Sequence, residues 1–487
     1  MQLSTEDNTF AFYAALVAVL LTTLYYILKK RGLPPGPTGL PFFGYYPFLD
    51  DDKIHHQLQN LGKKYGNVFS FTATGTLYIN LGSAASIREA LVTKSECFQH
   101  RLEEPNQLFD HLEGGMLFLK GEPWKVIRKF FLQQFRERGL TVIKKEMSGS
   151  IYDTVQSTIN DLAKKKGKPV DMPSILVTKC SEIIRQAIFG NDGMTEDELK
   201  HFCNHYGEAV NTLTGTSVFP SGVIAKYFIL PYLKGVKEGR KAAEMIQGVL
   251  LNAIKRRRST YNENHVRDLV DAYIKEGNIR RSKNDPIAKY FTDKALVRTL
   301  LQVVGDGIVF VSFFITSFLN VLLEHPEEQE RIYKELIEVV GEDRNPSLED
   351  KSKLPYTNAF IAEVLRCNDL FTTFPTLECC KETTVSGYRI PKGAVLMYNF
   401  WMAHMNPDDY EEPQKFNPSR YVVKDGKKRP ELPVSFGMGK RSCMGEGYTM
   451  NQVFLFLSTI VKHFHLKKPI EDKEDKTFIC AHPRKES

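Results

Sequence analysis

Several features that would narrow the class of this 487-residue chain are missing from its sequence. Its eight cysteines show neither the spacing of a zinc site nor the density of a disulfide framework, which fits a reducing compartment. No internal repeat and no Gly/Ser-rich linker interrupt the chain, so we expect Leu33–Ser487 to form one globular unit. The formal net charge of +7 is modest and gives no reason to expect a nucleic acid as partner.

One long apolar run, Phe10–Leu28, is long enough to cross a bilayer as a helix. Glu6 and Asp7 precede it and Lys29-Lys30-Arg31 follow it, so the positive-inside rule leaves the N-terminus across the membrane and the bulk of the chain in the cytoplasm. A cleavable signal would have a basic start and a small-residue end, and both are missing. The sequence therefore predicts a lumenal N-terminus (1–9), a transmembrane signal anchor (10–28), a basic and proline-rich hinge (29–37) and one large domain (38–487).

The most informative segment runs from Phe436 to Gly445 and reads F-G-M-G-K-R-S-C-M-G. Its cysteine, Cys443, comes just before an apolar helix predicted over Tyr448–His463. Backbone N–H donors and the N-terminal end of that helix dipole are expected to lower the pKa of the thiol. The glycines permit tight turns and close approach of a flat ligand, and Arg441 lies two residues from the sulfur, where it can neutralise an anionic group.

The spaced pattern F-x-x-G-x-R-x-C-x-G resembles the haem-binding signature of the cytochrome P450 family at every fixed position. The resemblance implies that haem b (heme b) is the cofactor, that Cys443 is the axial ligand of its iron, and that Arg441 holds a propionate. Phe436, Gly437 and Gly445 are then part of the cofactor-binding loop.

Two further segments resemble the family in the expected order. Glu363-Val364-Leu365-Arg366 matches its E-x-x-R helix, and Arg420 in Asn417-Pro418-Ser419-Arg420-Tyr421 matches its P-x-R-F segment. Residues three apart on a helix share a face, so Glu363 and Arg366 can pair and reach a third partner. The resemblance implies a structural ion triad of Glu363, Arg366 and Arg420.

Trp124 and Arg128 lie one helical turn apart in Gly121-Glu122-Pro123-Trp124-Lys125-Val126-Ile127-Arg128. Pro123 suits the first turn of a helix. The segment resembles the W-x-x-x-R helix of the family, which implies that both side chains hold haem propionates. The alternative from the residues alone is an amphipathic helix whose tryptophan packs in the core.

A long apolar helix is predicted from Thr292, as its N-cap, to the His325-Pro326 end. It resembles the family's central helix, with one departure. The usual acid and alcohol, which relay protons for O–O cleavage, are replaced by Val309 and Phe310. Asp306 lies one turn earlier on a similar face. Because an aspartate in an apolar helix is costly unless paired or functional, we interpret Asp306 either as a proton relay or substrate contact, or as a structural cap to a distorted turn at Gly305 and Gly307.

Aromatic and apolar residues around these motifs are expected to line an apolar substrate pocket. Many relatives carry a His or Arg after the E-x-x-R helix that also binds propionate, but this chain has Leu377 and Glu378 there, so no fourth propionate contact is assigned. The predicted pocket residues are Phe109, Phe118, Phe310, Phe371, Phe374 and Leu377.

The resemblance implies a mostly α cytochrome P450 fold with a small β region, preceded by one transmembrane helix in the endoplasmic reticulum membrane, with the catalytic domain (38–487) in the cytoplasm. The expected reaction is a haem-thiolate monooxygenation of a lipophilic small molecule with NADPH-derived electrons. Because the acid and alcohol are missing, two alternatives stay open: a reductase-independent isomerase or dehydratase of peroxides, and a haem-binding protein without turnover.

Basic residues gather near the predicted cofactor loop and would attract an acidic redox partner. The expected partner is the NADPH-cytochrome reductase, with cytochrome b5 as a second candidate, and membrane lipid is expected at the anchor. The residues that make this face basic are Lys125, Arg128, Lys129, Arg136, Arg138 and Lys440.

Overall fold

The computed structural model describes residues 13, 16–17, 31–50, 53–101, 114–140, 145–190, 193–211, 225, 227–232, 236–367, 373–422, 430–469 and 478–484. The predicted lumenal segment (1–9) lies outside the described residues, as does nearly all of the predicted anchor (10–28). Three anchor residues, Tyr13, Leu16 and Val17, are described, and all three are exposed.

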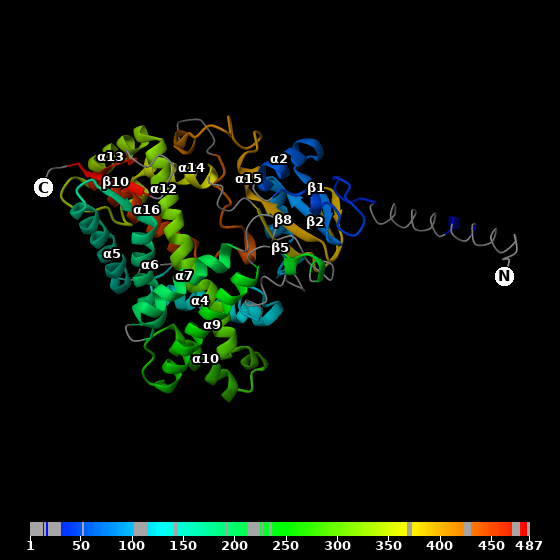
Figure 1. Ribbon diagram of the computed structural model, residues 1–487, viewed down its shortest axis with the longest axis horizontal. Helices are drawn as coiled ribbons and strands as arrows, with labels where there is room; N and C mark the ends of the chain where they lie inside the picture. The colour runs from blue at the N-terminus through cyan, green and yellow to red at the C-terminus, as the bar shows by residue number, and fades with distance from the viewer. Residues whose placement is uncertain are drawn as a thin grey trace.

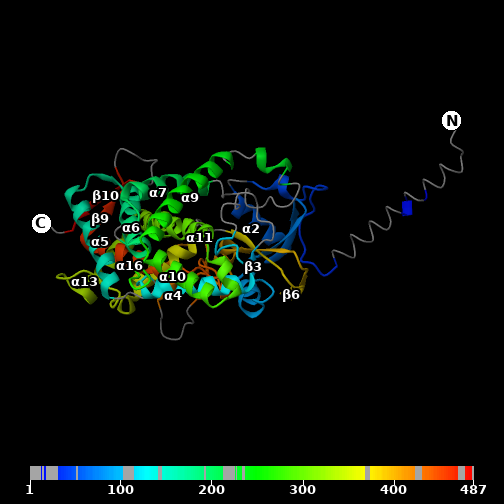
Figure 2. The ribbon, with the colours of Figure 1, turned by 90° about the horizontal axis from the view of Figure 1, so that it is seen from below.

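Helices make up most of the molecule, which confirms the predicted mostly α class (Figure 1). They gather at one end, while a smaller β region lies toward the N-terminus, and the two views agree on this division (Figure 2). The longer helices are α2 (Ile54–Tyr65), α4 (Gly121–Glu137), α5 (Lys145–Lys164), α6 (Met172–Phe189), α7 (Glu196–Asn211), α9 (Val236–Ser259), α10 (Leu269–Ser282), α11 (Asp293–Gly305), α12 (Val311–Glu324), α13 (Pro326–Val340), α14 (Pro355–Cys367) and α16 (Glu446–His463). Two short ones are α3 (Ala84–Arg88) and α15 (Phe400–His404).

The main sheet has the strand order β1-β2-β8-β5-β3. Only β2 and β8 run parallel within it, while the other neighbours are antiparallel. In β3, Arg101 pairs with Leu377, which joins two segments far apart in the chain. The strands are β1 (Val68–Ala73), β2 (Thr76–Leu81), β3 (His100–Arg101), β5 (Thr373–Glu378) and β8 (Val395–Asn399) in this sheet, β4 (Pro169–Asp171), β9 (Phe464–Lys467) and β10 (Phe478–Pro483) in a second, and β6 (Thr383–Val385) and β7 (Tyr388–Ile390) in a hairpin.

The predicted central helix begins and ends where the sequence indicates. The side chain of Thr292 accepts a hydrogen bond from the Ala295 N–H, and the helix ends at His325 before Pro326. Between α11 and α12 it contains a π-helical turn, η7 (Asp306–Phe310). Of the described helices, Asp293–Glu324 alone is long and apolar enough to cross a membrane, but 56% of its apolar window is buried, and it packs against α6 and α16 in the main core.

Candidate functional site

The loop that carries Cys443 is a tight turn just before α16. Gly437 and Gly439 have φ angles of +74° and +70°, a region that favours glycine. A Cβ on Gly439 would lie 2.0 Å from the carbonyl oxygen of Leu91, so this glycine lets the loop pack against the backbone at Leu91. The Cys443 N–H donates to the Phe436 carbonyl at 2.8 Å and closes the turn.

The sulfur of Cys443 lies deep in the protein and yet remains accessible. The residue is exposed, but burial raises the pKa of its thiol to about 11. The Gly445 N–H, which donates to the sulfur at 3.3 Å, and Arg128 lower this pKa, while Asp306 and Glu446 raise it. The expectation of a lowered thiol pKa is therefore wrong, because burial outweighs the N–H donor.

Two arginines and a tryptophan surround the entrance to the cysteine loop. Arg128 on α4 donates to the carbonyl of Ser442 at 2.6 Å. The Arg441 guanidinium lies 3.9 Å from the ring centre of Trp124, and it donates to the carbonyl oxygens of Gln99, Leu117 and Leu119. Helix α4 thus fixes the loop from one side through Arg128, and Arg441 of the loop itself is a second cation near Cys443.

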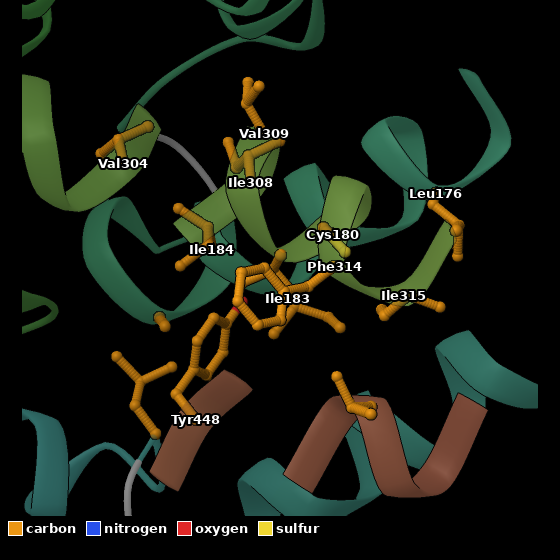
Figure 3. Close-up of a cluster of buried hydrophobic side chains, with 14 of the residues drawn as sticks. Leu176, Cys180, Ile183, Ile184, Val304, Ile308, Val309, Phe314, Ile315 and Tyr448 are labelled. Carbon is orange, nitrogen blue, oxygen red and sulfur yellow. The ribbon is translucent and has the colours of Figure 1, made fainter. Parts of the chain in front are cut away.

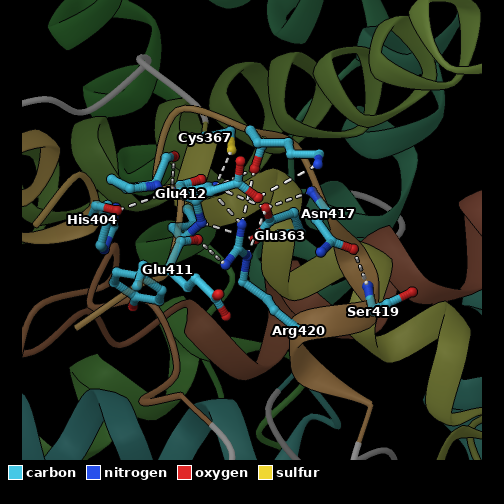
Figure 4. A network of polar contacts seen from close by, with 12 residues as sticks. Glu363, Cys367, His404, Glu411, Glu412, Asn417, Ser419 and Arg420 are labelled. Carbon is cyan, nitrogen blue, oxygen red and sulfur yellow. Dashed lines mark hydrogen bonds and ion pairs between the residues drawn. The ribbon is translucent and has the colours of Figure 1, made fainter. Parts of the chain in front are cut away.

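A buried ion cluster joins α14 to the segment around Arg420 (Figure 4). Arg366 donates to both oxygens of Glu363 at 2.8 Å, and Arg420 donates to Glu363 Oε1 at 3.1 Å. Glu363 and Arg366 are fully buried. The structure thus brings together the three residues of the predicted triad, while its role in stability stays a prediction.

The face of the central helix around Asp306 is partly accessible within the protein interior. Gln302, Asp306 and Phe310 recur at helical spacing and each retain some exposed surface, whereas Val309 is 8% exposed. Burial raises the pKa of Asp306 to about 6, although hydrogen bonds from Tyr206 and Gln302 oppose this shift. The Tyr206 hydroxyl donates to Asp306 Oδ1 at 2.5 Å. This carboxyl can therefore hold or release a proton near neutral pH.

Comparisons with known proteins decide the family. A sequence profile of cytochrome P450 matches residues 34–485. The chain belongs to the cytochrome P450 family. Cytochrome P450 2J1 of Oryctolagus cuniculus is 30% identical over 96% of this chain and 95% of its own length. Cytochrome P450 2J5 of Mus musculus is 28% identical over 96% of each chain, and cytochrome P450 2B4 of Oryctolagus cuniculus is 28% identical over 96% of this chain and 95% of its own length.

Membership confirms two expectations, a haem-thiolate monooxygenase in general and a cysteine-ligated haem iron as cofactor. The residues around Cys443 fit that group. Neither Arg128 nor Arg441 forms an ion pair with a carboxylate of the described residues. Burial and the nearby Arg101 and Arg128 lower the pKa of Arg441 to about 8. Two half-buried arginines, Arg128 and Arg441, without a carboxylate partner in the part of the chain that the structure describes suit the two propionates of a haem, which supply negative charge.

The structure distributes the predicted pocket residues of this cytochrome P450 unevenly. Phe118 is buried in the main core and Phe310 packs against it from the central helix, while Leu377 is buried in a second cluster beside the sheet. Phe374 pairs with Tyr398 in β5, but its side chain lies outside the described part. Phe109 and Phe371 also lie outside the described residues, so these pocket assignments stay predictions.

Three residues near the site had no signal in the sequence. Arg101 in β3 donates to the Tyr398 hydroxyl at 3.5 Å and lies close enough to Arg441 to affect its pKa. Tyr206 reaches Asp306 from α7. Tyr448 on α16 donates to the carbonyl of Gly307 at 3.4 Å, within the apolar cluster of Figure 3. Each depends on contacts between elements distant in sequence, which spacing within one element does not reveal.

Proposed function

We propose that this cytochrome P450 inserts one oxygen atom from O2 into a lipophilic small molecule with electrons from NADPH. The observation that carries the proposal is the exposed residue Cys443 beside two half-buried arginines, Arg128 and Arg441, that have no carboxylate partner among the described residues. When bound, the haem supplies the activation of dioxygen and the transfer of one oxygen atom.

The chain's own residues have separate tasks in this proposal. Cys443 provides the thiolate ligand, and the Gly445 N–H holds its sulfur in position. Trp124, Arg128 and Arg441 hold the propionates. Asp306 stores a proton on the central helix, where its pKa of about 6 lets it be refilled from solvent near neutral pH. The apolar core around η7 limits the access of water.

Electrons are proposed to come from the NADPH-cytochrome reductase, with cytochrome b5 as a second donor. Exposed cations support a docking face near the cysteine loop, because α4 carries Lys125, Lys129 and Arg136 at its surface, and Lys440 is exposed in the loop itself. Such a face attracts an acidic partner and accelerates the encounter at low salt.

The endoplasmic reticulum membrane is the proposed location, with one span at residues 10–28 and domain 38–487 in the cytoplasm. The apolar run and the basic residues after it support a span in this orientation. Exposed apolar side chains on the described domain support additional contact with lipid, among them Phe42, Phe43, Tyr227, Phe228 and Tyr232.

One experiment tests the proposal against its rivals. Full-length protein loaded with haem is combined with the reductase and a panel of lipophilic compounds, and NADPH consumption and oxygenated product are measured. A parallel reaction is fed a lipid hydroperoxide without NADPH. NADPH-dependent product supports the monooxygenase. If Cys443→Ser loses both this product and the red-shifted Soret band of the reduced carbon monoxide complex, the activity depends on the thiolate.

Because Val309 and Phe310 stand where the family usually has an acid and an alcohol, we consider a second candidate function. An isomerase or dehydratase of peroxides needs neither a reductase nor a proton relay. Rapid turnover of the hydroperoxide without any response to NADPH would favour this candidate and contradict the monooxygenase. Haem binding with no turnover in either reaction would contradict both.

A further inference from the structure

Buried Tyr206 and half-buried Asp306 form a pair that joins two helices. The Tyr206 hydroxyl on α7 donates to Asp306 Oδ1 in η7 at 2.5 Å, and Tyr206 is 4% exposed. Gln302, one turn earlier on α11, also hydrogen-bonds the carboxyl. Among the described residues, no Lys, Arg or His forms an ion pair with Asp306. Two neutral donors therefore stabilise a half-buried carboxylate, although charges withdrawn from water are ordinarily paired with an opposite charge.

The surrounding residues hold Tyr206 in place for this contact. A Cβ on Gly305, the neighbour of Asp306, would lie 2.1 Å from the Tyr206 ring, so only glycine leaves room for the ring to approach. The ring of Phe202 stacks on Tyr206 with a centroid distance of 5.7 Å and an interplanar angle of 11°. The π-helical turn begins at Asp306 itself. Gly305, the stacked ring of Phe202 and the π-helical turn together fix the position of the Asp306 carboxyl group.

We propose that Tyr206 is the positioning residue for Asp306, and that this pair from two helices takes the place of the acid and alcohol missing at Val309 and Phe310 as the proton-holding group of the reaction. This inference rests on the proposed monooxygenase function. In the step concerned, the Asp306 carboxyl would give its proton to the oxygen atom of O2 that leaves as water, and the negative charge stays on the carboxylate, where the hydroxyl of Tyr206 and the amide of Gln302 stabilise it. Solvent then returns one proton to the carboxylate.

The direction of the pH effect follows from the groups that face Asp306. Tyr206 on α7 and Gln302 on α11 lower its pKa by donating to it. Cys443 is close enough to Asp306 for their charges to interact. Tyr448 on α16 donates to the carbonyl of Gly307, the residue after Asp306. On α6 the apolar Ile184 packs against the neighbouring Gly307, and burial raises the pKa of Cys180 to about 12. Loss of the Tyr206 hydroxyl should therefore raise the Asp306 pKa.

The test begins with an observation that does not require turnover. In the full-length, haem-loaded protein, the infrared carbonyl band of protonated Asp306 is obtained by difference against Asp306→Asn and titrated with pH. We expect a midpoint near the pKa of about 6 in the parent. In Tyr206→Phe it should rise by about one pH unit, because a hydrogen bond to a charged group is lost.

Two further variants separate positioning from a general loss of stability. Gly305→Ala should displace the Tyr206 ring and raise the midpoint in the same direction without removing the hydroxyl. Tyr273→Phe is the matched control, since Tyr273 is also buried and donates to the carbonyls of Tyr290 and Thr292, away from Asp306. An unchanged midpoint in Tyr206→Phe, or an equal shift in Tyr273→Phe, would overturn the positioning role.

The second measurement concerns the reaction. NADPH and reductase are added without substrate, and hydrogen peroxide released per NADPH is followed against pH. Peroxide should increase as Asp306 loses its proton, and in Tyr206→Phe this increase should move up by about one pH unit. In Asp306→Asn the pH step should vanish, and Tyr206→Phe added to it should change nothing further. A pH step that persists in Asp306→Asn overturns the proton-holding role.

If the parent itself consumes no NADPH, the proposed function fails and the reaction role with it, while the infrared titration still decides whether Tyr206 positions Asp306.

Discussion

At the residue scale, Glu363 shows how one buried carboxylate can organise a larger region. Its Oε1 accepts from Arg366, Arg420 and the N–H of Asn417, and its Oε2 accepts from Arg366. Arg366 in turn donates to the carbonyls of His404 and Pro413. The cluster thereby ties α14 to the long irregular segment that leads to the cysteine loop.

Replacing Glu363 by Gln keeps its size but leaves two arginines without their counter-charge. Removing one partner of a buried ion pair costs about 3–5 kcal/mol, so we expect a loss of that order in the free energy of unfolding. Urea denaturation followed by circular dichroism measures it. Glu122→Gln is the matched control, since Glu122 pairs with Lys125 at the surface and should matter little. Equal losses in the two variants would show that the cluster is not a source of stability.

His404 makes the stability of the domain depend on pH. It is 3% exposed, and its Nε2 accepts from the Val434 N–H at 2.9 Å. Burial and the nearby Arg366 lower its pKa to about 3, whereas an unfolded histidine titrates near 6.5. Because the unfolded state binds the proton more tightly, this contribution is present above pH 6.5 and declines as the pH falls toward 3. Between pH 7 and 4.5 the decline should be about 2–3 kcal/mol.

His404→Gln tests this dependence, since a glutamine oxygen can accept from Val434 but cannot titrate. Unfolding free energies at pH 7 and 4.5 are compared for the two proteins. The variant should lose less stability over this interval than the parent. Parallel curves would mean that other groups, and not His404, account for the acid sensitivity.

The resemblance of short motifs to those of the family predicted the site residues that belong to a motif. Cys443, Arg441 and the pair Trp124 and Arg128 could be assigned in this way, and the structure brings them together. The raised pKa of the thiol was not predicted, because burial depends on everything packed around the sulfur. Arg101 was missed for a similar reason, since its position follows from the pairing of β3 with β5.

At the scale of elements, the cysteine loop depends on one close backbone contact. Gly439 lies against the carbonyl of Leu91 in the π-helical segment Glu89–Thr93, where a Cβ would come within 2.0 Å. Gly439→Ala must therefore shift the loop, and we expect a clear loss of bound haem per protein, measured by absorbance. Gly341→Ala is the control, because Gly341 also has a positive φ of +78° but has no atom within 4 Å of the added Cβ. Retained haem in Gly439→Ala would contradict this account.

The central helix shows where prediction of an element succeeds and where it stops. Its ends were predictable from Thr292 as a cap and from Pro326 as a terminator, since both signals are local. The π-helical turn was not, although Gly305 and Gly307 suggested a distortion there. It depends on Tyr206 and Ile184 packing against these two glycines from α7 and α6. Such packing is decided by the tertiary structure.

At the scale of the whole molecule, one group of exposed apolar residues lies where the described domain begins. Leu40 and Gly44 pair across a tight turn that carries Phe42 and Phe43, of which Phe42 is 80% exposed. This turn begins 12 residues after the end of the predicted anchor at Leu28. A second, weaker contact with lipid would therefore reinforce the first.

Removing residues 1–31 should release much of the protein from membranes, because the predicted span is the largest apolar segment that would enter the bilayer. The turn at Phe42 and Phe43 should retain a fraction, so flotation with phospholipid vesicles is expected to recover some of the shortened protein. Adding Phe42→Ser and Phe43→Ser should abolish this remainder. The same two substitutions in the full-length chain are the control, and they should leave it membrane-bound because the span alone suffices. If the full-length protein itself stays in the soluble fraction, the predicted anchor is wrong, and if the shortened protein floats equally well with and without the serines, the turn is not its contact with lipid.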